Sequence, residues 1–273
     1  MIKELLTYIS FHLEEKITLE ELAKISGYSP FHLHKILKQE LQDSIGNYIK
    51  KQRMRKAAYL IGLTTTPISE VKHLVGYDND SSFARAFKDV YNITPTAFRE
   101  NNQLKKKIIN LNDDYVSLKY STIKFKEREA FIFPSYGNYF SKDIYLIWKD
   151  VAHYLQINNL NHEEFEYYAI LHNCQHFDME TPLRYDAALV PKNKTLLNTN
   201  PFLKIILPSE RFAVYRFCSK VSDYQQNSLV ITRHLIESSG FEHREGAAYF
   251  RFHQFPDWKD PDNLLLDWYL PIK

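Results

Sequence analysis

Two segments of this chain, 29–38 and 80–88, place polar, basic and aromatic side chains at the spacing of a helix face. The candidates in the first segment are Ser29, Phe31, His32, His34, Lys35 and Lys38, and those in the second are Asp80, Ser81, Ser82, Arg85 and Lys88. Such groups can pair with base edges and phosphates in the major groove of a duplex. Arg85 can donate two hydrogen bonds to a guanine, and Phe31 can contact a thymine methyl group. Any one of them, taken alone, is equally well explained as an ordinary exposed residue.

The two segments belong to an internal repeat with an offset of 49 to 50 residues. Gly27-Tyr28 matches Gly76-Tyr77 at the shorter offset. The pairs that match at the longer offset are Leu33 with Phe83, Lys35 with Arg85, Leu37 with Phe87, Lys38 with Lys88 and Tyr48 with Phe98. Each copy predicts a short helix, a turn that contains glycine and a second helix, which is the order of a helix-turn-helix unit. Because the pattern occurs twice, the explanation that these are ordinary exposed residues becomes weaker.

Capping signals predict where several helices begin. Thr18 is followed three residues later by Glu21, while Ser29 and Thr94 each precede a proline. Residues 44–63 predict one long helix that joins the two copies rigidly. Its basic side chains are Lys50, Lys51, Arg53, Arg55 and Lys56.

The charge is unevenly distributed along the chain. Residues 1–107 hold 17 Lys and Arg against 12 Asp and Glu, a net charge of +5, whereas residues 108–273 hold 18 against 21, a net charge of −3. A basic first part indicates a polyanion-binding module joined to a part with another task. Taken alone, this charge imbalance is also explained by chance fluctuation.

The sequence favours a cytoplasmic protein without membrane contact. No apolar run approaches the roughly 18 residues of a membrane-spanning helix, and the first residues lack the apolar core of a secretion signal. Two cysteines, Cys174 and Cys218, are too few for a disulfide framework.

Over residues 1–101 the sequence resembles the AraC/XylS family of transcription regulators, of the compact MarA and Rob type. The residues that carry the resemblance are 27–38, Tyr48, 53–57 with Leu60, 83–88, Thr94-Pro95 and Phe98-Arg99. It implies that one molecule places two recognition helices in successive major grooves of double-stranded DNA, so that a dimer is not required. RNA polymerase is a further expected partner of such a regulator.

Two positions depart from the family pattern. Lys35 replaces a common arginine and lacks its planar fork, so we expect a phosphate contact there rather than base readout. Asp80 brings a negative charge toward DNA, where it either accepts a hydrogen bond from a cytosine or caps its helix.

A polar stretch separates this part of the chain from the rest. We expect a DNA-binding domain at 1–107, a linker at 108–115 and a second domain at 116–273. In the second domain, alternation and helical periodicity predict a strand at 125–133, a helix at 142–157 and strands at 167–171 and 185–190. The same order follows at 212–217, 225–237, 247–252 and 264–272. The predicted fold class is multidomain: an all-α N-terminal domain with two helix-turn-helix units, then an α+β domain of two β-α-β-β repeats.

The second domain resembles the GyrI-like effector-binding domain. The residues that carry this resemblance are 181–187, Leu207-Pro208, 211–215, 239–241 and 264–272. It implies a cleft between two related halves that is lined by aromatic rings and binds hydrophobic small molecules. Our candidates for this effector site are Tyr136, Tyr139, Trp148, Tyr168, Phe250, Trp258 and Trp268, each of which is equally well explained as a core or surface aromatic residue.

One substitution changes the expected ligand. The family commonly has a glutamate in the penultimate strand, and Phe250 stands at that position. Without this carboxylate a buried cation would lack compensation, so we expect a neutral or anionic apolar effector, or none. Asp267 and Glu245 are alternative carboxylates, although solvated surface acids explain them better.

We expect no cofactor, no metal and no enzymatic activity. His172, Cys174 and His176 share one strand face, but a fourth zinc ligand such as His162 or Asp178 would have to be assumed. The sequence lacks the motifs of serine hydrolases, zinc proteases and phosphate-binding loops. The alternatives for the second domain are a degenerate protein-interaction module and a small-molecule hydrolase.

Overall fold

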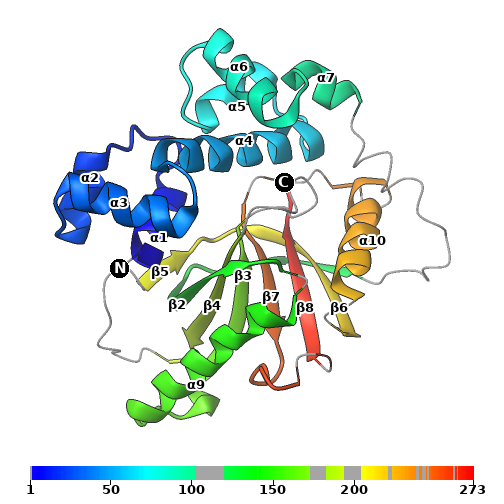
Figure 1. Ribbon diagram of the computed structural model, residues 1–273. Coiled ribbons are helices and arrows are strands. Elements are labelled where there is room, and N and C mark those ends of the chain that lie inside the picture. Colours follow the sequence, from blue (N-terminus) through cyan, green and yellow to red (C-terminus); the bar gives the residue numbers. More distant parts are fainter. Residues whose placement is uncertain are drawn as a thin grey trace. The chain divides into compact units, whose positions relative to one another are not determined.

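The computed structural model of the protein (Figure 1) describes residues 2–101, 120–139, 141–172, 183–193, 204–220, 223–237, 240–241, 244, 246–260, 262 and 264–273. It divides into two compact units, Met1–Gln103 and Leu104–Lys273, which we call the helical unit and the sheet unit. The predicted linker at 108–115 and the candidate ligands Cys174, His176 and Asp178 lie outside the described residues. No helix in the described part of the chain is both long and apolar enough to cross a membrane.

The described part of the helical unit consists of helices joined by short turns. Their bounds are α1 Ile2–Phe11, α2 Leu19–Ser26, α3 Pro30–Leu41, α4 Ile45–Leu63, α5 Ile68–Leu74, α6 Asp80–Tyr91 and α7 Pro95–Glu100. Figure 1 shows α1, α2 and α3 near one end of α4, whereas α5, α6 and α7 lie toward its other end. The long helix predicted at 44–63 is confirmed.

Side-chain caps fix where these helices begin, because each one satisfies a backbone N–H that has no partner within its helix. The predicted caps at Thr18, Ser29 and Thr94 are confirmed, and Ser44 caps α4 in the same way. The hydrogen bonds run from Glu21 N to Thr18 Oγ1 (3.2 Å), from His32 N to Ser29 Oγ (3.3 Å), from Asn47 N to Ser44 Oγ (3.2 Å) and from Ala97 N to Thr94 Oγ1 (3.2 Å).

The repeat in the sequence has a counterpart in the backbone. Gln42 ends α3 with a φ of 52°, and Asn92, fifty residues later, ends α6 with a φ of 59°. The matched apolar residues Leu33, Leu37, Phe83 and Phe87 are all buried. The pairs α2-α3 and α5-α6 therefore correspond in the buried residues and in the end of their second helix, and we call them the first copy and the second copy.

Arg53 on α4 joins the two copies. Its guanidinium donates hydrogen bonds from Nε to Leu13 O (2.7 Å) and from Nη2 to Glu15 O (2.6 Å), both in the segment between α1 and α2. It also donates from Nη1 to Gly76 O (3.1 Å) in the turn of the second copy. Charge-assisted hydrogen bonds are stronger than neutral ones. One side chain therefore ties α4 to the segment before the first copy and to the turn of the second copy.

The sheet unit has one antiparallel sheet of eight strands among its described residues. Their bounds are β1 Tyr120–Lys124, β2 Arg128–Gly137, β3 Phe165–Leu171, β4 Leu183–Pro191, β5 Lys204–Leu207, β6 Arg211–Ser219, β7 Ala248–Phe252 and β8 Leu264–Pro271, and their order in the sheet is β1-β6-β8-β7-β3-β4-β2-β5. A 3₁₀ turn, η1 (Lys142–Leu146), leads into α9 (Ile147–Ile157), and α10 (Tyr224–Glu237) follows β6.

The prediction for this unit needs two corrections. The strand predicted at 125–133 corresponds to β2. It begins at Arg128 and ends at Gly137, so Phe125 lies before it rather than within it. The edge strands β1 and β5 are additional to the predicted β-α-β-β pattern. β1 is mostly exposed and β5 has only four residues, so neither gives a run of alternating residues long enough for the prediction.

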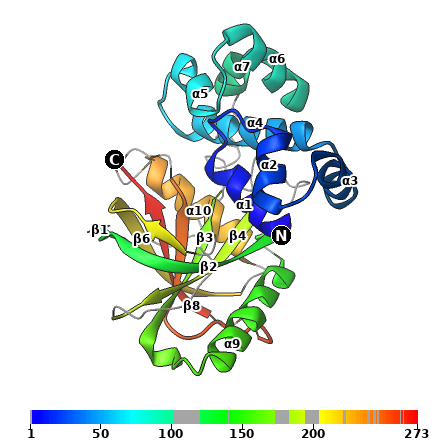
Figure 2. The ribbon, with the colours of Figure 1, turned by 90° about the vertical axis from the view of Figure 1, so that its left-hand side faces the viewer.

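The two faces of the sheet are covered differently. The face that carries Phe250 and Trp268 packs against α9 and α10, and we call it the helix face (Figure 1). The opposite face, which carries Tyr168 and Tyr249, we call the distal face; it holds a second buried cluster. The curvature of the sheet is visible from two directions (Figures 1 and 2).

Phe125 belongs to the buried cluster of the distal face. Its backbone N–H donates to Glu210 O (2.7 Å), so the segment before β2 meets the segment before β6. The ring of Phe125 lies about as far from Tyr168 (6.0 Å between centroids) as from Tyr249 (5.9 Å). This edge-on packing of rings closes the second core.

Two glycines at equivalent turns, Gly27 and Gly76, test whether the second turn packs against the segment after α1. Gly76 has a φ of 76°, and a Cβ there would lie 2.8 Å from the carbonyl oxygens of Leu13 and Glu14. Gly27 has a φ of 73°, but a Cβ there would meet nothing within 4 Å. Both alanine variants carry the strain of a left-handed residue, about 1 to 2 kcal/mol. Gly76→Ala should lose a further amount of about 2 kcal/mol through overlap with the backbone.

Urea unfolding followed by far-ultraviolet circular dichroism measures this difference. Equal losses in Gly76→Ala and Gly27→Ala would show that the segment after α1 is not packed on the second turn.

Candidate nucleic-acid interface and effector domain

The helices α3 and α6 present the predicted contact residues to solvent. Every one of them is exposed: Ser29, Phe31, His32, His34, Lys35, Lys38, Asp80, Ser81, Ser82, Arg85 and Lys88. The opposite faces of the same helices hold Leu33 and Phe83, which are buried. Each helix therefore has one face in the core and one face available to a partner.

Phe31 is the most unusual of these residues. Its side chain is 84% exposed, the highest value among the large hydrophobic residues described. A phenylalanine side chain stabilises the folded protein mainly when its ring is buried, so this exposed ring contributes little to the free energy of folding. Next to it, the rings of Tyr28 and His32 lie 5.1 Å apart. The beginning of α3 thus offers an aromatic surface to a partner.

Four basic residues on these helices are free of ion pairs. Among the described residues, none of Lys35, Lys38, Arg85 and Lys88 lies within salt-bridge distance of a carboxylate. By contrast, Lys51 on α4 pairs with Asp43 at 2.9 Å. The unpaired charges are therefore on the exposed faces of α3 and α6, where an anion can reach them.

Of the two roles considered for Asp80, the helix cap is wrong. Asn79 caps α6, and its Oδ1 accepts hydrogen bonds from the N–H groups of Ser81 (2.8 Å) and Ser82 (3.1 Å). Asp80 instead pairs with Lys72 of α5 through Nζ and Oδ1 at 2.7 Å. This ion pair partly offsets the negative charge that Asp80 brings to the exposed face of α6.

The predicted effector residues are not all brought together. Tyr139, Trp148, Phe250 and Trp268 are buried in the core of the helix face, and Trp258 packs against that core. Tyr168 is buried in the cluster of the distal face, on the other side of the sheet. Tyr136 belongs to β2, where its neighbours Ala130 and Ile132 at even positions also face the distal side. A single pocket therefore cannot use the whole set.

Phe250 occupies its position with close aromatic packing. Its ring centroid lies 4.9 Å from that of Trp268 and 5.6 Å from that of Tyr224. Both ring pairs meet edge to face. All three side chains are buried. The position where the resemblance led us to expect a carboxylate is thus occupied by an apolar ring among other rings.

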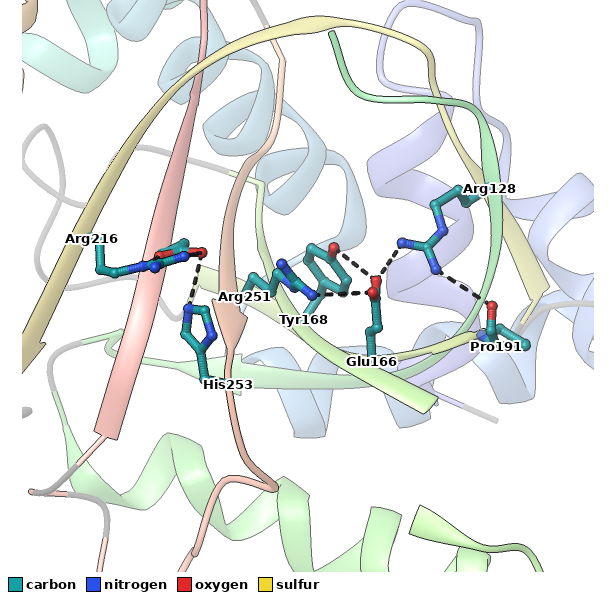
Figure 3. Close-up of polar contacts among 8 residues, drawn as sticks. Arg128, Glu166, Tyr168, Pro191, Arg216, Arg251 and His253 are labelled. Atoms are coloured by element: carbon teal, nitrogen blue, oxygen red, sulfur yellow. Dashed lines mark hydrogen bonds and ion pairs between the residues drawn. The ribbon is translucent and has the colours of Figure 1, made fainter. Parts of the chain in front are cut away.

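The interpretation of Asp267 as a solvated acid is also wrong. Asp267 is buried on the distal face and pairs with Arg216 and His253 (Figure 3), while Glu245 lies outside the described residues. On the same face, Glu166 is held by Arg128 and by Arg251. These charged residues were missed because their partners come from strands that are far apart in the sequence.

The acidic groups of the distal face are held ionised. Burial alone would raise the pKa of Asp267, but its hydrogen bonds to Arg216 and His253 outweigh burial and hold the pKa below its usual value. The pKa of Glu166 is lowered in the same way, with burial opposed by Arg128 and Arg251. A buried carboxylate with such partners remains charged near neutral pH.

Asp186 on β4 is a third carboxylate of this kind. It accepts hydrogen bonds from Arg184 Nε (2.9 Å) and Nη2 (2.6 Å), and its Oδ2 lies 2.8 Å from His172 Nε2. Burial would raise its pKa, but the charges and hydrogen bonds of His172 and Arg184 lower it below the usual value. His172, once considered as a metal ligand, is therefore engaged with Asp186. Within the described residues, no three His, Cys, Asp or Glu side chains gather as a metal site would require.

Family models match both units. Residues 118–273 match the model described as a GyrI-like small molecule binding domain, and residues 22–101 match a helix-turn-helix domain. The chain belongs to the AraC/XylS family of DNA-binding transcription regulators and carries a GyrI-like domain at its second unit.

Individual relatives match over the helical unit. The multiple antibiotic resistance protein MarA of Escherichia coli (strain K12) is 30% identical over 101 residues, which cover 37% of this chain and 80% of MarA. The transcriptional regulator Rob of Salmonella typhimurium (strain LT2) is 32% identical over 103 residues, or 38% of this chain and 36% of Rob. The match thus spans about a third of Rob's length. A solved DNA-binding transcriptional dual regulator from Escherichia coli K-12 is 30% identical, with a TM-score of 0.34, over 36% of this chain and 87% of that chain.

Removal of the exposed ring should separate binding from stability. Phe31→Ala should leave the free energy of unfolding within about 0.5 kcal/mol of the wild type, because the ring is not packed. Its affinity for a duplex should fall by about 1 to 2 kcal/mol through lost apolar contact. The neighbouring Leu33→Ala should instead lose about 2 to 5 kcal/mol of stability. A fluorescence-anisotropy titration with a duplex and a urea unfolding curve provide the two readouts, and unchanged duplex affinity in folded Phe31→Ala would contradict the role of the ring.

Low pH should destabilise the sheet unit, because Asp186 becomes protonated. A carboxyl group with a lowered pKa stabilises the fold above its unfolded pKa of about 3.8, and this contribution is lost as the pH falls through the folded pKa. Asp186→Asn should therefore lose about 3 kcal/mol or more at pH 7 by leaving Arg184 buried without its partner charge. Below pH 3.8 the difference from the wild type should narrow.

Tryptophan fluorescence during urea unfolding reports this effect, because all three tryptophans lie in the sheet unit. The control Asp150→Asn changes an exposed residue of α9 and should cost less than about 1 kcal/mol. A loss in Asp186→Asn that stays constant from pH 7 to acid would contradict the assignment.

Proposed function

We propose that this chain regulates transcription by binding specific DNA sequences with α3 and α6. The observation that carries the proposal is the equivalence of the two helices: each turns one face into the core and exposes the residues that can contact DNA. The four basic residues without ion pairs lie on these exposed faces. Family membership supports the same function.

The roles of the side chains follow from their chemistry. Lys35, Lys38 and Lys88 bind phosphates, which makes affinity fall as salt rises. Arg85 pairs with a guanine through its planar guanidinium, and Phe31 contacts a thymine methyl group. Ser29, His32, His34, Asp80, Ser81 and Ser82 complete the contact surface.

The spacing of the two helices suits one face of a duplex. Between them lies α4, a helix of 19 residues, which at 1.5 Å per residue is about 28 Å long. One turn of duplex is about 34 Å. Since Arg53 ties both copies to α4, one molecule presents two reading helices at a fixed spacing, and binding needs no dimer.

We further propose the organisation of the whole chain: a DNA-binding domain at 1–107, a linker at 108–115 and an effector-binding domain at 116–273. The effector domain consists of two related halves. In support, the strand order reads the same from both ends when β1 is exchanged with β5, β2 with β6, β3 with β7 and β4 with β8. His172 and Asp186 recur as His253 and Asp267 at a common offset of 81 residues, and each histidine contacts its aspartate.

The effector domain senses a small molecule rather than acting as an enzyme. The family description as a small molecule binding domain supports sensing, and Phe250 stands where a catalytic or cation-binding carboxylate would be required. RNA polymerase is the partner through which bound regulator acts, and the cytoplasm is its place of action.

A selection from random duplexes tests the proposed DNA-binding role. Arg85→Ala should lose about 1 to 3 kcal/mol on the selected sequence and lose preference at one base pair, because a base contact is removed. Its neighbour Lys88→Ala should weaken binding to all duplexes alike and flatten the salt dependence, because a phosphate contact is removed. If Arg85→Ala weakened random duplexes as much as the selected one, the base-reading role would be wrong. Failure of the wild-type chain to enrich any sequence would contradict the proposed function.

A further inference from the structure

The distal face carries a row of charged side chains that alternate in sign across the sheet (Figure 3). In order from β2 to β6 they are Arg128, Glu166, Arg251, Asp267 and Arg216. Arg251 and Arg216 each stand opposite Asp267 in the strand register. We call this set, together with His253, the distal row. It begins and ends with an arginine.

Each carboxylate of the distal row is held from more than one side. Glu166 Oε1 accepts from Arg251 Nη2 at 3.1 Å, while its Oε2 accepts from Arg128 and from the hydroxyl of Tyr168 (3.2 Å). Asp267 accepts from Arg216 Nε (2.6 Å) and Nη2 (3.0 Å), and its Oδ2 lies 3.0 Å from His253 Nε2. The cations are therefore fixed in position before any ligand arrives.

The exposure of these groups shows which charge a ligand would meet. The side chains of Asp267 and Glu166 are 3% and 19% exposed, whereas those of Arg216 and Arg251 are 64% and 33% exposed. The carboxylates are thus more buried than the guanidinium groups. Arg128, Arg216 and Arg251 bring three positive charges against the two negative charges of Glu166 and Asp267, so the outer surface of the row attracts anions.

An apolar side chain lies beside this cationic surface. Leu265 precedes Asp267 by two residues on β8 and therefore points to the same face. It is 41% exposed, and its carbonyl accepts a hydrogen bond from His253 N (3.3 Å). Positive charge next to an exposed apolar side chain is the combination that an amphipathic anion requires.

We propose that the distal row around Arg216, Arg251 and His253 binds a small organic carboxylate whose apolar part rests on Leu265. This inference rests on the small-molecule sensing proposed above and assigns the ligand's charge and place. Arg216 uses one proton each of Nε and Nη2 on Asp267, which leaves both Nη1 protons and the second Nη2 proton for the ligand. A guanidinium fork matches the planar carboxylate head. Because Asp267 and Glu166 already orient the arginines, binding immobilises few additional side chains.

The location separates this site from the helix face. There, Phe250 is buried among Trp268 and Tyr224 and carries no charge to meet a ligand. On β7 the next residue, Arg251, points to the opposite face. The strand that lacks the expected carboxylate on one face thus carries a cation on the other.

Calorimetric titration of the full chain tests the proposal with benzoate, 2-naphthoate and decanoate, each compared with its uncharged amide. At least one carboxylate should bind. The affinity of its amide should be lower by a factor of about ten or more, because hydrogen bonds to charged groups are worth about 1.5 to 3 kcal/mol. Arg216→Gln should weaken the carboxylate by about tenfold, and Arg216→Lys, which keeps the charge without the fork, by a smaller factor.

Arg211→Gln is the matched control, since Arg211 is exposed on the same strand but points to the helix face, over Phe241. It should bind the carboxylate like the wild type. Equal affinity for acid and amide, equal affinity in Arg216→Gln and Arg211→Gln, or no binding of any carboxylate at millimolar concentration would each overturn the proposal. Duplex binding measured on the same preparations separates the two proposals: if it persists while carboxylates fail to bind, only the distal site is wrong.

Discussion

The guanidinium of Arg53 is the interaction on which the DNA-reading geometry depends. It donates to carbonyl oxygens on both sides of α4, at Leu13 and Glu15 near the first copy and at Gly76 in the second. Backbone carbonyls at such places would otherwise need water or another donor. Gly76 permits this approach because it has no Cβ, and its left-handed conformation suits glycine. Arg53 thus adds three hydrogen bonds that hold α4 to the segment before the first copy and to the turn of the second copy.

In the sheet unit, the two faces of one sheet have separate tasks. The helix face is filled by aromatic and aliphatic side chains packed against α9 and α10, and Phe250 lies within this apolar core. On the distal face, Phe125 closes an aromatic cluster, and the charged residues beside it are paired with partners from neighbouring strands. Because side chains alternate along a strand, neighbouring residues such as Phe250 and Arg251 serve different environments. This alternation lets one sheet keep an aromatic core on its helix face and paired charged side chains on its distal face.

Local chemistry was readable from the sequence, and long-range pairing was not. The caps at Thr18, Ser29 and Thr94 were predictable because a cap depends on residues within one helical turn. Exposure on α3 and α6 followed from periodicity. The choice of Asn79 over Asp80 as a cap required coordinates, since both residue types can fill that role. Tyr168 was grouped with Trp148 and Phe250 because composition does not reveal which sheet face a residue occupies. Asp267 was taken for a surface acid because its partners Arg216 and His253 are distant in sequence.

The most direct test of the central claim uses the spacing between the two halves of a selected DNA site. Inserting about 5 base pairs turns the second half to the far side of the duplex, and inserting about 10 returns it to the same side but one turn farther away. If Arg53 and α4 hold the reading helices rigidly, both insertions should reduce affinity to that of a single half-site. Recovery of full affinity with the longer insertion would show that the two copies move independently, which would contradict the account.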